Sequence, residues 1–181
     1  MTRILGIDPG SRITGYGVIE MDNNRAIYVD CGCIRAVGES LAERLKSIYD
    51  GIQAVVETHT PDEVSIEKVF MGKNVDSALK LGQARGAALC AAQTPEALIV
   101  EYSPTEIKKA IVGKGRADKT QVQQMVRILL NLQGKLQVYA ADALAIALCH
   151  GNTRQMLNKL DLGTGNKRNA WTNYIANPTR R

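Results

Sequence analysis

The apolar positions of the 181-residue chain follow a strand-like pattern at the start and a helical period further on. Three apolar, β-rich segments come first, and short polar turns separate them: residues 4–8, 14–19 and 26–34. Such segments predict an antiparallel meander of three strands. Apolar residues then recur at intervals of three and four after Ser40, which forms a capping box with Glu43. The first helix is therefore expected to begin just after Ser40.

Strands and helices alternate through the rest of the chain. Residues 64–67 form a strand that is reached through the first helix, so we expect it to run parallel to the first strand. The elements expected after it are a helix, a strand and three further helices, over residues 75–93, 97–102, 104–112, 119–130 and 139–150. Ser103 and Glu106 make a second capping box, with Pro104 at the first helical position. This order predicts an α/β domain with a mixed five-stranded sheet and helices on both faces.

The charge of the chain indicates one domain followed by a basic tail. The net charge is +5. Residues 153–181 are rich in Asn, Thr and Gly, and they hold six basic residues against one acid, Asp161. We therefore expect one folded domain over residues 1–152 and a flexible tail over 153–181 that binds polyanions. A second excess of basic residues lies between residues 107 and 127. It is explained either by a segment that binds phosphate or by a solvated helix face.

The composition excludes several classes of protein. No run of 18 apolar residues exists, so no transmembrane helix and no membrane partner are expected. The N-terminal segment turns into a strand at once and does not resemble a secretory signal. The four cysteines form no CxxC pair, and with two histidines they do not show the spacing of a zinc site. We expect reduced thiols that serve as small core residues, and a cytoplasmic protein.

Three carboxylates occupy unusual places. Asp8 ends the first strand before a Pro-Gly turn, Glu67 ends the fourth strand, and Asp142 interrupts the apolar helix "AADALAIALCH". Each of these acids, taken alone, also has an ordinary structural explanation: an acid at a strand end can cap a turn, and an acid can pair with a lysine. Together, on neighbouring strands and a helix packed across them, they require a cation to offset their burial. Oxygen ligands favour Mg²⁺, with Mn²⁺ as a substitute, and two ions about 4 Å apart would clamp a scissile phosphate.

Four long segments, in order, resemble the RuvC family of bacterial Holliday-junction resolvases: "ILGIDPGSRITGYGVI", "IEKVFMGKNVDSALKLGQARGAA", "KKAIVGKGRADKTQVQQMV" and "AADALAIALCH". The resemblance runs from about Ile4 to His150. It implies an RNase H-like fold and a homodimer that cuts two opposing strands of four-way junction DNA, in recombination and repair. It also implies the branch-migration complex RuvA–RuvB as a partner. Asp8, Glu67 and Asp142 match three of the family's four metal-binding residues.

The fourth of these positions holds Tyr139, where the family usually has Asp and sometimes His. A phenol with a pKa of about 10 is a poor ligand for a hard divalent ion at neutral pH. Weakened cleavage is therefore expected. The alternative function is a junction-binding protein with impaired or no cleavage, because Tyr139 replaces an acidic ligand.

The resemblance also implies DNA-contacting residues. Phe70 matches an aromatic residue that inserts beside bases near the junction centre, where stacking is worth roughly 1–3 kcal/mol. Lys108, Lys119 and Arg116 match basic positions that lie against the DNA backbone. The glycines of "GIDPGSRITGYG" also fit an actin-like sugar kinase or ATPase. We do not expect that class here, because it requires a second, similar lobe and a chain about twice as long.

Overall fold

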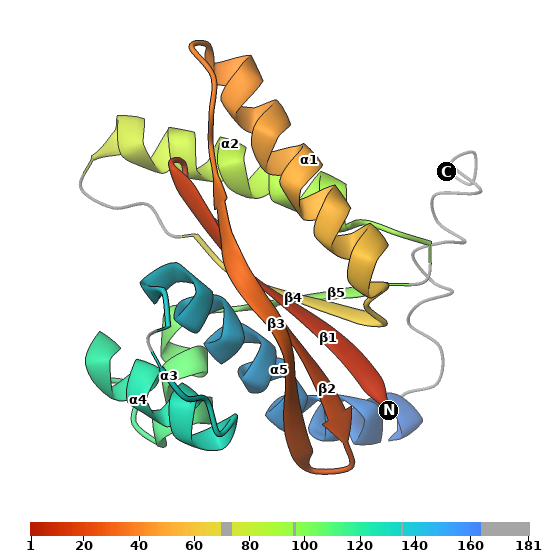
Figure 1. Cartoon of the computed structure of the whole chain (residues 1–181). Coiled ribbons are helices and arrows are strands. Elements are labelled where there is room, and N and C mark those ends of the chain that lie inside the picture. Colours follow the sequence, from red (N-terminus) through yellow and green to blue (C-terminus); the bar gives the residue numbers. More distant parts are fainter. Residues whose placement is uncertain (70–73, 96, 135, 164–181) are drawn as a thin grey trace, which may run out of the picture.

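The computed structural model describes residues 1–69, 74–95, 97–134 and 136–163, and for residues 155–163 the course of the helix alone (Figure 1). Ten elements follow one another within this part: β1 (Thr2–Asp8), β2 (Ile13–Asp22), β3 (Arg25–Arg35), α1 (Leu41–His59), β4 (Glu63–Glu67), α2 (Val75–Ala92), β5 (Leu98–Tyr102), α3 (Pro104–Val112), α4 (Lys119–Leu129) and α5 (Val138–Gly163). No helix of these residues is long and apolar enough to cross a membrane.

The strands form one mixed sheet in the order β3-β2-β1-β4-β5. β1, β2 and β3 pair antiparallel, which confirms the predicted meander. β4 pairs in parallel with β1 on one side and with β5 on the other, as expected for strands reached through helices. The sheet therefore brings the carboxyl ends of β1 and β4 side by side.

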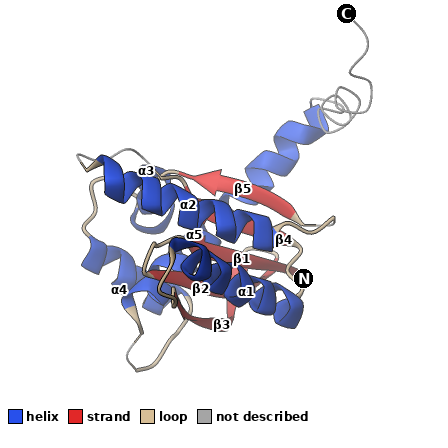
Figure 2. Ribbon diagram, turned by 90° about the horizontal axis from the view of Figure 1, so that it is seen from above, coloured by secondary structure: helices blue, strands red, loops and turns tan. Residues whose placement is uncertain are grey.

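Helices cover both faces of this sheet (Figure 2). On one face, α1 and α2 pack against Leu5, Ile7 and Ile66. On the other face, α3, α4 and α5 enclose a second core with Ile4 and Ile19. Neighbouring strand residues such as Ile4 and Leu5 enter different cores, because successive side chains of a strand point to opposite faces. The predicted arrangement of helices on both faces is confirmed.

Local signals account for most of the helix starts. The capping boxes at Ser40 and Ser103 are both present. A third capping box, which the sequence analysis missed, joins Asp118 to Gln121 at the start of α4. In each box the side chain at the N-cap accepts a hydrogen bond from a backbone N–H that the helix itself leaves unpaired.

Helix α5 continues beyond residue 150, where the sequence pattern predicted its end, and reaches Gly163. A partly buried polar network ties the start of this extension to the sheet. Glu63, at the start of β4, accepts hydrogen bonds from His150 at 2.6 Å and from the guanidinium of Arg154 at 2.8 Å. The other ring nitrogen of His150 lies 2.8 Å from the hydroxyl of Tyr102. Arg154, counted among the basic residues of the predicted tail, is thus part of the folded body.

Candidate active site

The strands place Asp8 and Glu67 on the same face of the sheet. Ile7 of β1 pairs with Ile66 of β4 in parallel register, so the following residues, Asp8 and Glu67, stand at neighbouring carboxyl ends. Ile7 and Ile66 both enter the core under α1 and α2. Because side chains alternate along a strand, the two acids point to the opposite face, which α5 covers.

Glycines let α5 lie directly on that face. A Cβ atom on Gly6 would come within 2.2 Å of the backbone oxygen of Ala143, and one on Gly15 within 2.1 Å of the backbone oxygen of Tyr139. The hydroxyl of Ser65 on β4 also donates a hydrogen bond to the backbone oxygen of Ile146, at 3.3 Å. This close packing brings the first turns of α5, and with them Asp142, over the ends of β1 and β4.

Two of the three predicted acids, Asp8 and Glu67, have raised pKa values. Burial, followed by repulsion from Glu67 and Asp142, raises the pKa of Asp8 to about 8. Burial and repulsion from Asp142 also raise the pKa of Glu67. Carboxylates crowded in this way hold a proton unless a cation neutralises their charge. The structure thus brings the three acids that the sequence singled out close together.

Asp142 is paired with a lysine. The Nζ atom of Lys119 lies 2.5 Å from Oδ2 of Asp142, and the amide nitrogen of Gln123 lies 3.5 Å from Oδ1. Burial opposes the charged form of Lys119, but the contact with Asp142 outweighs it and raises the pKa of the lysine. The sequence analysis missed Gln123. Its spacing of four residues from Lys119, on one face of α4, is the signal that could have indicated it.

The donor set fits a hard divalent cation. All three acids offer carboxylate oxygens, which Mg²⁺ and Mn²⁺ prefer. Burial and repulsion between the acids raise the pKa values of Asp8 and Glu67, so a bound cation would offset this cost. In the described part of the chain, no three Asp, Glu, His or Cys side chains lie close enough together to enclose an ion as they stand. A metal ion would have to draw Asp142 away from Lys119 and towards the two strand-end acids.

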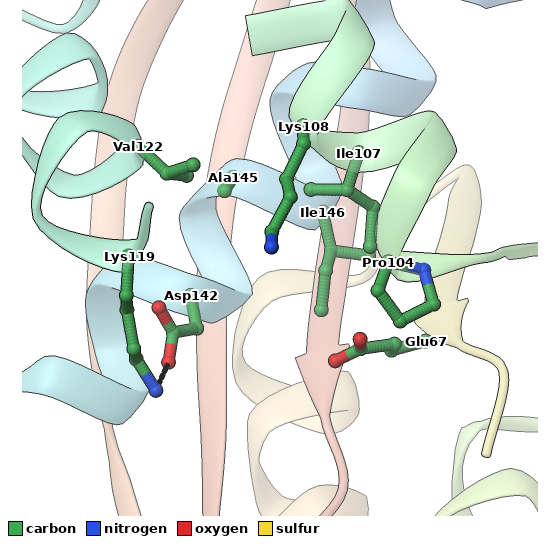
Figure 3. Close-up of a pocket in the computed structure, with 9 residues that line it drawn as sticks. All are labelled: Glu67, Pro104, Ile107, Lys108, Lys119, Val122, Asp142, Ala145 and Ile146. Atoms are coloured by element: carbon green, nitrogen blue, oxygen red, sulfur yellow. Dashed lines mark ion pairs between the residues drawn. The ribbon is translucent and has the colours of Figure 1, made fainter. Parts of the chain in front are cut away.

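A cavity of about 190 Å³ opens beside these groups, between α3, α4 and α5 (Figure 3). Nine residues line it: Glu67, Pro104, Ile107, Lys108, Lys119, Val122, Asp142, Ala145 and Ile146. Lys108 extends into it from α3, and Lys119 approaches Asp142 from α4. Two of the three predicted basic residues therefore adjoin the acids. Arg116 is exposed and does not line the cavity, and Phe70 lies outside the described residues.

Tyr139 lies at the rim of the site. Its side chain is 41% exposed, and its ring centre is 5.9 Å from the Nζ atom of Lys119, the same amine that pairs with Asp142. It is not among the residues that line the cavity. The phenol thus shares a lysine neighbour with Asp142 across one turn of α5.

The family model described as crossover junction endodeoxyribonuclease RuvC matches residues 4–150. A protein of that name from Hahella chejuensis is 52% identical over 168 residues, which cover 93% of this chain and 98% of that relative. Another from Shewanella putrefaciens is 56% identical over 157 residues, 87% of this chain and 91% of that relative.

Solved structures agree. RuvC of Thermus thermophilus in complex with a Holliday junction substrate superposes with a TM-score of 0.80 at 32% identity, over 86% of this chain and 96% of that chain. A yeast mitochondrial Holliday junction resolvase shares the fold, with a TM-score of 0.62 at 12% identity over 87% of this chain and 82% of that chain. The described fold is thus that of the RNase H-like resolvases.

Proposed function

Since the chain belongs to the RuvC family of crossover junction endodeoxyribonucleases, we propose that it binds four-way DNA junctions as a homodimer and cuts two opposing strands. The observation that carries the proposal is the gathering of Asp8, Glu67 and Asp142 on one face of the sheet, beside a cavity that two lysines adjoin. Acids and cations arranged in this way suit phosphodiester hydrolysis, because the acids hold metal and the cations hold phosphate.

Asp8, Glu67 and Asp142 are the residues that would hold Mg²⁺, and we expect two ions for each subunit, with Mn²⁺ able to replace them. Bound there, the metal would supply Lewis-acid activation of the attacking water and of the scissile phosphate. Lys119 would release Asp142 on metal binding, and its ammonium would then be free to contact a phosphate oxygen. Lys108 extends into the same cavity and would hold the strand in place.

Two of the predicted DNA contacts lie outside this cavity. Phe70 would stack on a base near the junction centre, since it follows Glu67 by only three residues. Arg116 is exposed in the loop that precedes α4, where its charge would add to the affinity for the backbone. Both remain predictions.

A nuclease that cuts junctions is favoured over a protein that binds junctions without cutting them. Relatives that are 52% and 56% identical over most of their length are named endodeoxyribonucleases. Tyr139 lies beside Lys119 rather than in the wall of the cavity, so water can take the place of the missing acidic ligand. We propose that Tyr139 lowers the rate of cleavage and has little effect on junction binding.

The outer face of α2 is the proposed dimer interface. Leu79 is 62% exposed, and a Cβ atom on Gly82 or Gly86 would meet no atom of the described residues within 4 Å. Cys90 lies on the same face of α2 as Leu79, Gly82 and Gly86. It is exposed, whereas the sequence predicted core thiols. Small side chains without neighbours allow a second helix to approach closely, and a two-fold axis gives the paired cuts that resolution requires.

By family resemblance the dimer would act in the cytoplasm with the branch-migration complex RuvA–RuvB. Residues after the domain would form the basic tail predicted from the sequence. Limited proteolysis tests this division: it should trim the tail and leave the folded body of the domain. Cleavage within the body before the tail would contradict it.

The test of the proposed function is a strand-cleavage assay on four-way junctions with Mg²⁺ or Mn²⁺. Asp8→Asn, Glu67→Gln and Asp142→Asn should each abolish cleavage while junctions are still bound. Asp50→Asn is the matched control, because Asp50 is an exposed acid of α1 that pairs with Lys46. Cleavage that survives all three substitutions, or a parent protein that does not bind junctions in preference to duplex DNA, would contradict the proposal.

A further inference from the structure

A second cavity, of about 140 Å³, lies on the other side of the sheet from the acids, beside the turn that joins β1 to β2. Eight residues line it: Ser11 and Arg12 of the turn, Leu41, Arg44, Leu45 and Ile48 of α1, and Lys80 and Ala84 of α2. Three elements that are far apart in the sequence each contribute one basic side chain. We call Ser11, Arg12, Arg44 and Lys80 the basic pocket.

The basic pocket has an excess of positive charge. Its lining includes no acid. Within the described part of the chain, the guanidinium groups of Arg12 and Arg44 form no ion pair or hydrogen bond, and Lys80 is paired with Asp76 at 2.6 Å, one turn away on α2. A cleft with charges of one sign and apolar walls concentrates a positive electrostatic potential that attracts anions. The planar guanidinium group of arginine also matches the geometry of the phosphate oxygens.

The pocket adjoins the candidate active site through a short, rigid turn. Only Pro9, Gly10 and Ser11 separate Asp8 from Arg12. The hydroxyl of Thr14 hydrogen-bonds to both backbone groups of Gly10, at 3.3 and 3.2 Å, and braces the turn. Four residues of extended chain span at most roughly 14 Å, so Arg12 lies about four nucleotide steps or fewer from the acids, at about 3.4 Å of helix rise per step.

We propose that the basic pocket binds a backbone phosphate of the junction other than the scissile one, so that each subunit holds the DNA on both faces of its sheet. This inference rests on the proposed junction binding. Arg12 and Arg44 would share the phosphate, Ser11 would donate a hydrogen bond to it, and Lys80 would add charge. Lys108 and Lys119, beside the acids, would hold the strand on the face under α5, and the basic pocket would hold it on the face under α1 and α2.

The experiment measures the affinity of the full-length chain for a four-way junction over a range of salt concentrations. Arg12→Ala/Arg44→Ala is the test variant. Arg25→Ala/Lys46→Ala is the matched control, which removes the same charge from the exposed first residue of β3 and from an exposed position on α1. Thermal unfolding shows that both variants are folded. Lys80→Ala, at an exposed position, replaces the test variant if that variant does not fold.

We expect the test variant to lower the slope of log affinity against log salt by about one, because a single phosphate contact is lost. Between 50 and 200 mM salt the parent should then lose about three to four times more affinity than the variant. The control should keep the parent's slope. An unchanged slope in the test variant, or an equal decrease in the control, would overturn the proposal.

Neutral methylphosphonate linkages, placed one at a time along the junction arms, locate the phosphate. One linkage outside the cleavage site should weaken binding of the parent and have no further effect on the test variant. If every linkage weakens both proteins equally, the pocket does not contact the backbone. A parent that does not bind the junction at all would instead refute the proposed function, which keeps the two failures distinct.

Discussion

Lys119 of α4 and Asp142 of α5 are joined by a 2.5 Å ion pair beside the two strand-end acids. The lysine that family resemblance assigns to DNA thus also neutralises a predicted metal ligand. Metal binding and release of Lys119 are linked, because a metal ion and the ammonium of Lys119 would bind the same carboxylate, that of Asp142. The ion pair therefore couples the metal site to the phosphate-binding side chains.

Lys119→Ala should strengthen metal binding in the absence of DNA. Without the competing ammonium, Asp142 is free to turn towards the cation. A tenfold gain in affinity, about 1.4 kcal/mol, would appear as a larger rise in the unfolding temperature on addition of Mn²⁺. Lys108→Ala is the control, since Lys108 lines the cavity and forms no ion pair with the described residues. A smaller Mn²⁺ shift in Lys119→Ala than in the parent would refute the competition.

Lys108→Ala should weaken binding to all junction sequences alike. The side chain lines the cavity beside the acids, where it would contact a phosphate, and a phosphate contact carries no base-specific information. The slope of log affinity against log salt should decrease by about one. If the slope is unchanged, Lys108 does not contact the backbone.

Tyr139→Asp should raise the rate of junction cleavage well above that of the parent, with nearly unchanged junction affinity. The new carboxylate lies one turn before Asp142 and adds a charged metal ligand that acts in the transition state. Single-turnover cleavage in Mg²⁺ and in Mn²⁺ measures the effect, and Asp8→Asn gives the background rate. A parent at that background that binds junctions tightly would restore the non-cutting alternative.

Leu79→Glu should convert the proposed dimer into monomers at micromolar concentration. The substitution places a charge in the middle of the proposed interface, where it would be buried without a partner. Sedimentation velocity measures the change, and Leu129→Glu, at an exposed position on α4, is the control. A parent that sediments as a monomer, both free and with junction DNA, would count against the dimer.

Gly6→Ala should destabilise the fold by about 3 kcal/mol or more, because the new methyl group would overlap the backbone of α5. At this chain length the loss corresponds to a decrease of roughly 6–12 °C in the unfolding temperature. Gly115→Ala is the matched control, since its methyl group would meet movable side-chain atoms of Thr105 and Lys109. Equal stability of the two variants would mean that α5 moves easily away from the sheet.

Glu63→Gln should remove an acid-sensitive part of the stability. Burial favours the neutral form of Glu63, but hydrogen bonds from His150 and Arg154 outweigh it and lower the pKa to about 2, below the ordinary value of 4.5. The carboxylate therefore stabilises the native state fully above about pH 4.5, and this contribution is lost as the pH falls towards 2.

Urea unfolding from pH 6 to pH 2 measures this contribution as the difference between parent and variant. The difference should be largest above pH 4.5 and shrink towards pH 2. Glu57→Gln, at an exposed position of α1, serves as the control and should follow the parent. A difference that does not depend on pH would show that Glu63 acts through packing alone.

The sequence by itself determined the order of the elements and the candidate acids. Alternation along β1 and the capping boxes at Ser40 and Ser103 depend on residues a few positions apart, so their effect is visible in the sequence. The same is true of Asp8 and Glu67, which each end a strand. The resemblance of long segments to one family added the expected activity.

Tertiary structure alone decided which groups meet. The pairing of Lys119 with Asp142, the attachment of Arg154 to Glu63 and the gathering of the basic pocket all join distant parts of the chain. Such contacts depend on how helices pack on the sheet, which the local pattern does not specify. The end of α5 was missed for the same reason: a polar segment continues the helix when Thr153 and Arg154 bond to Tyr102 and Glu63 in the folded body.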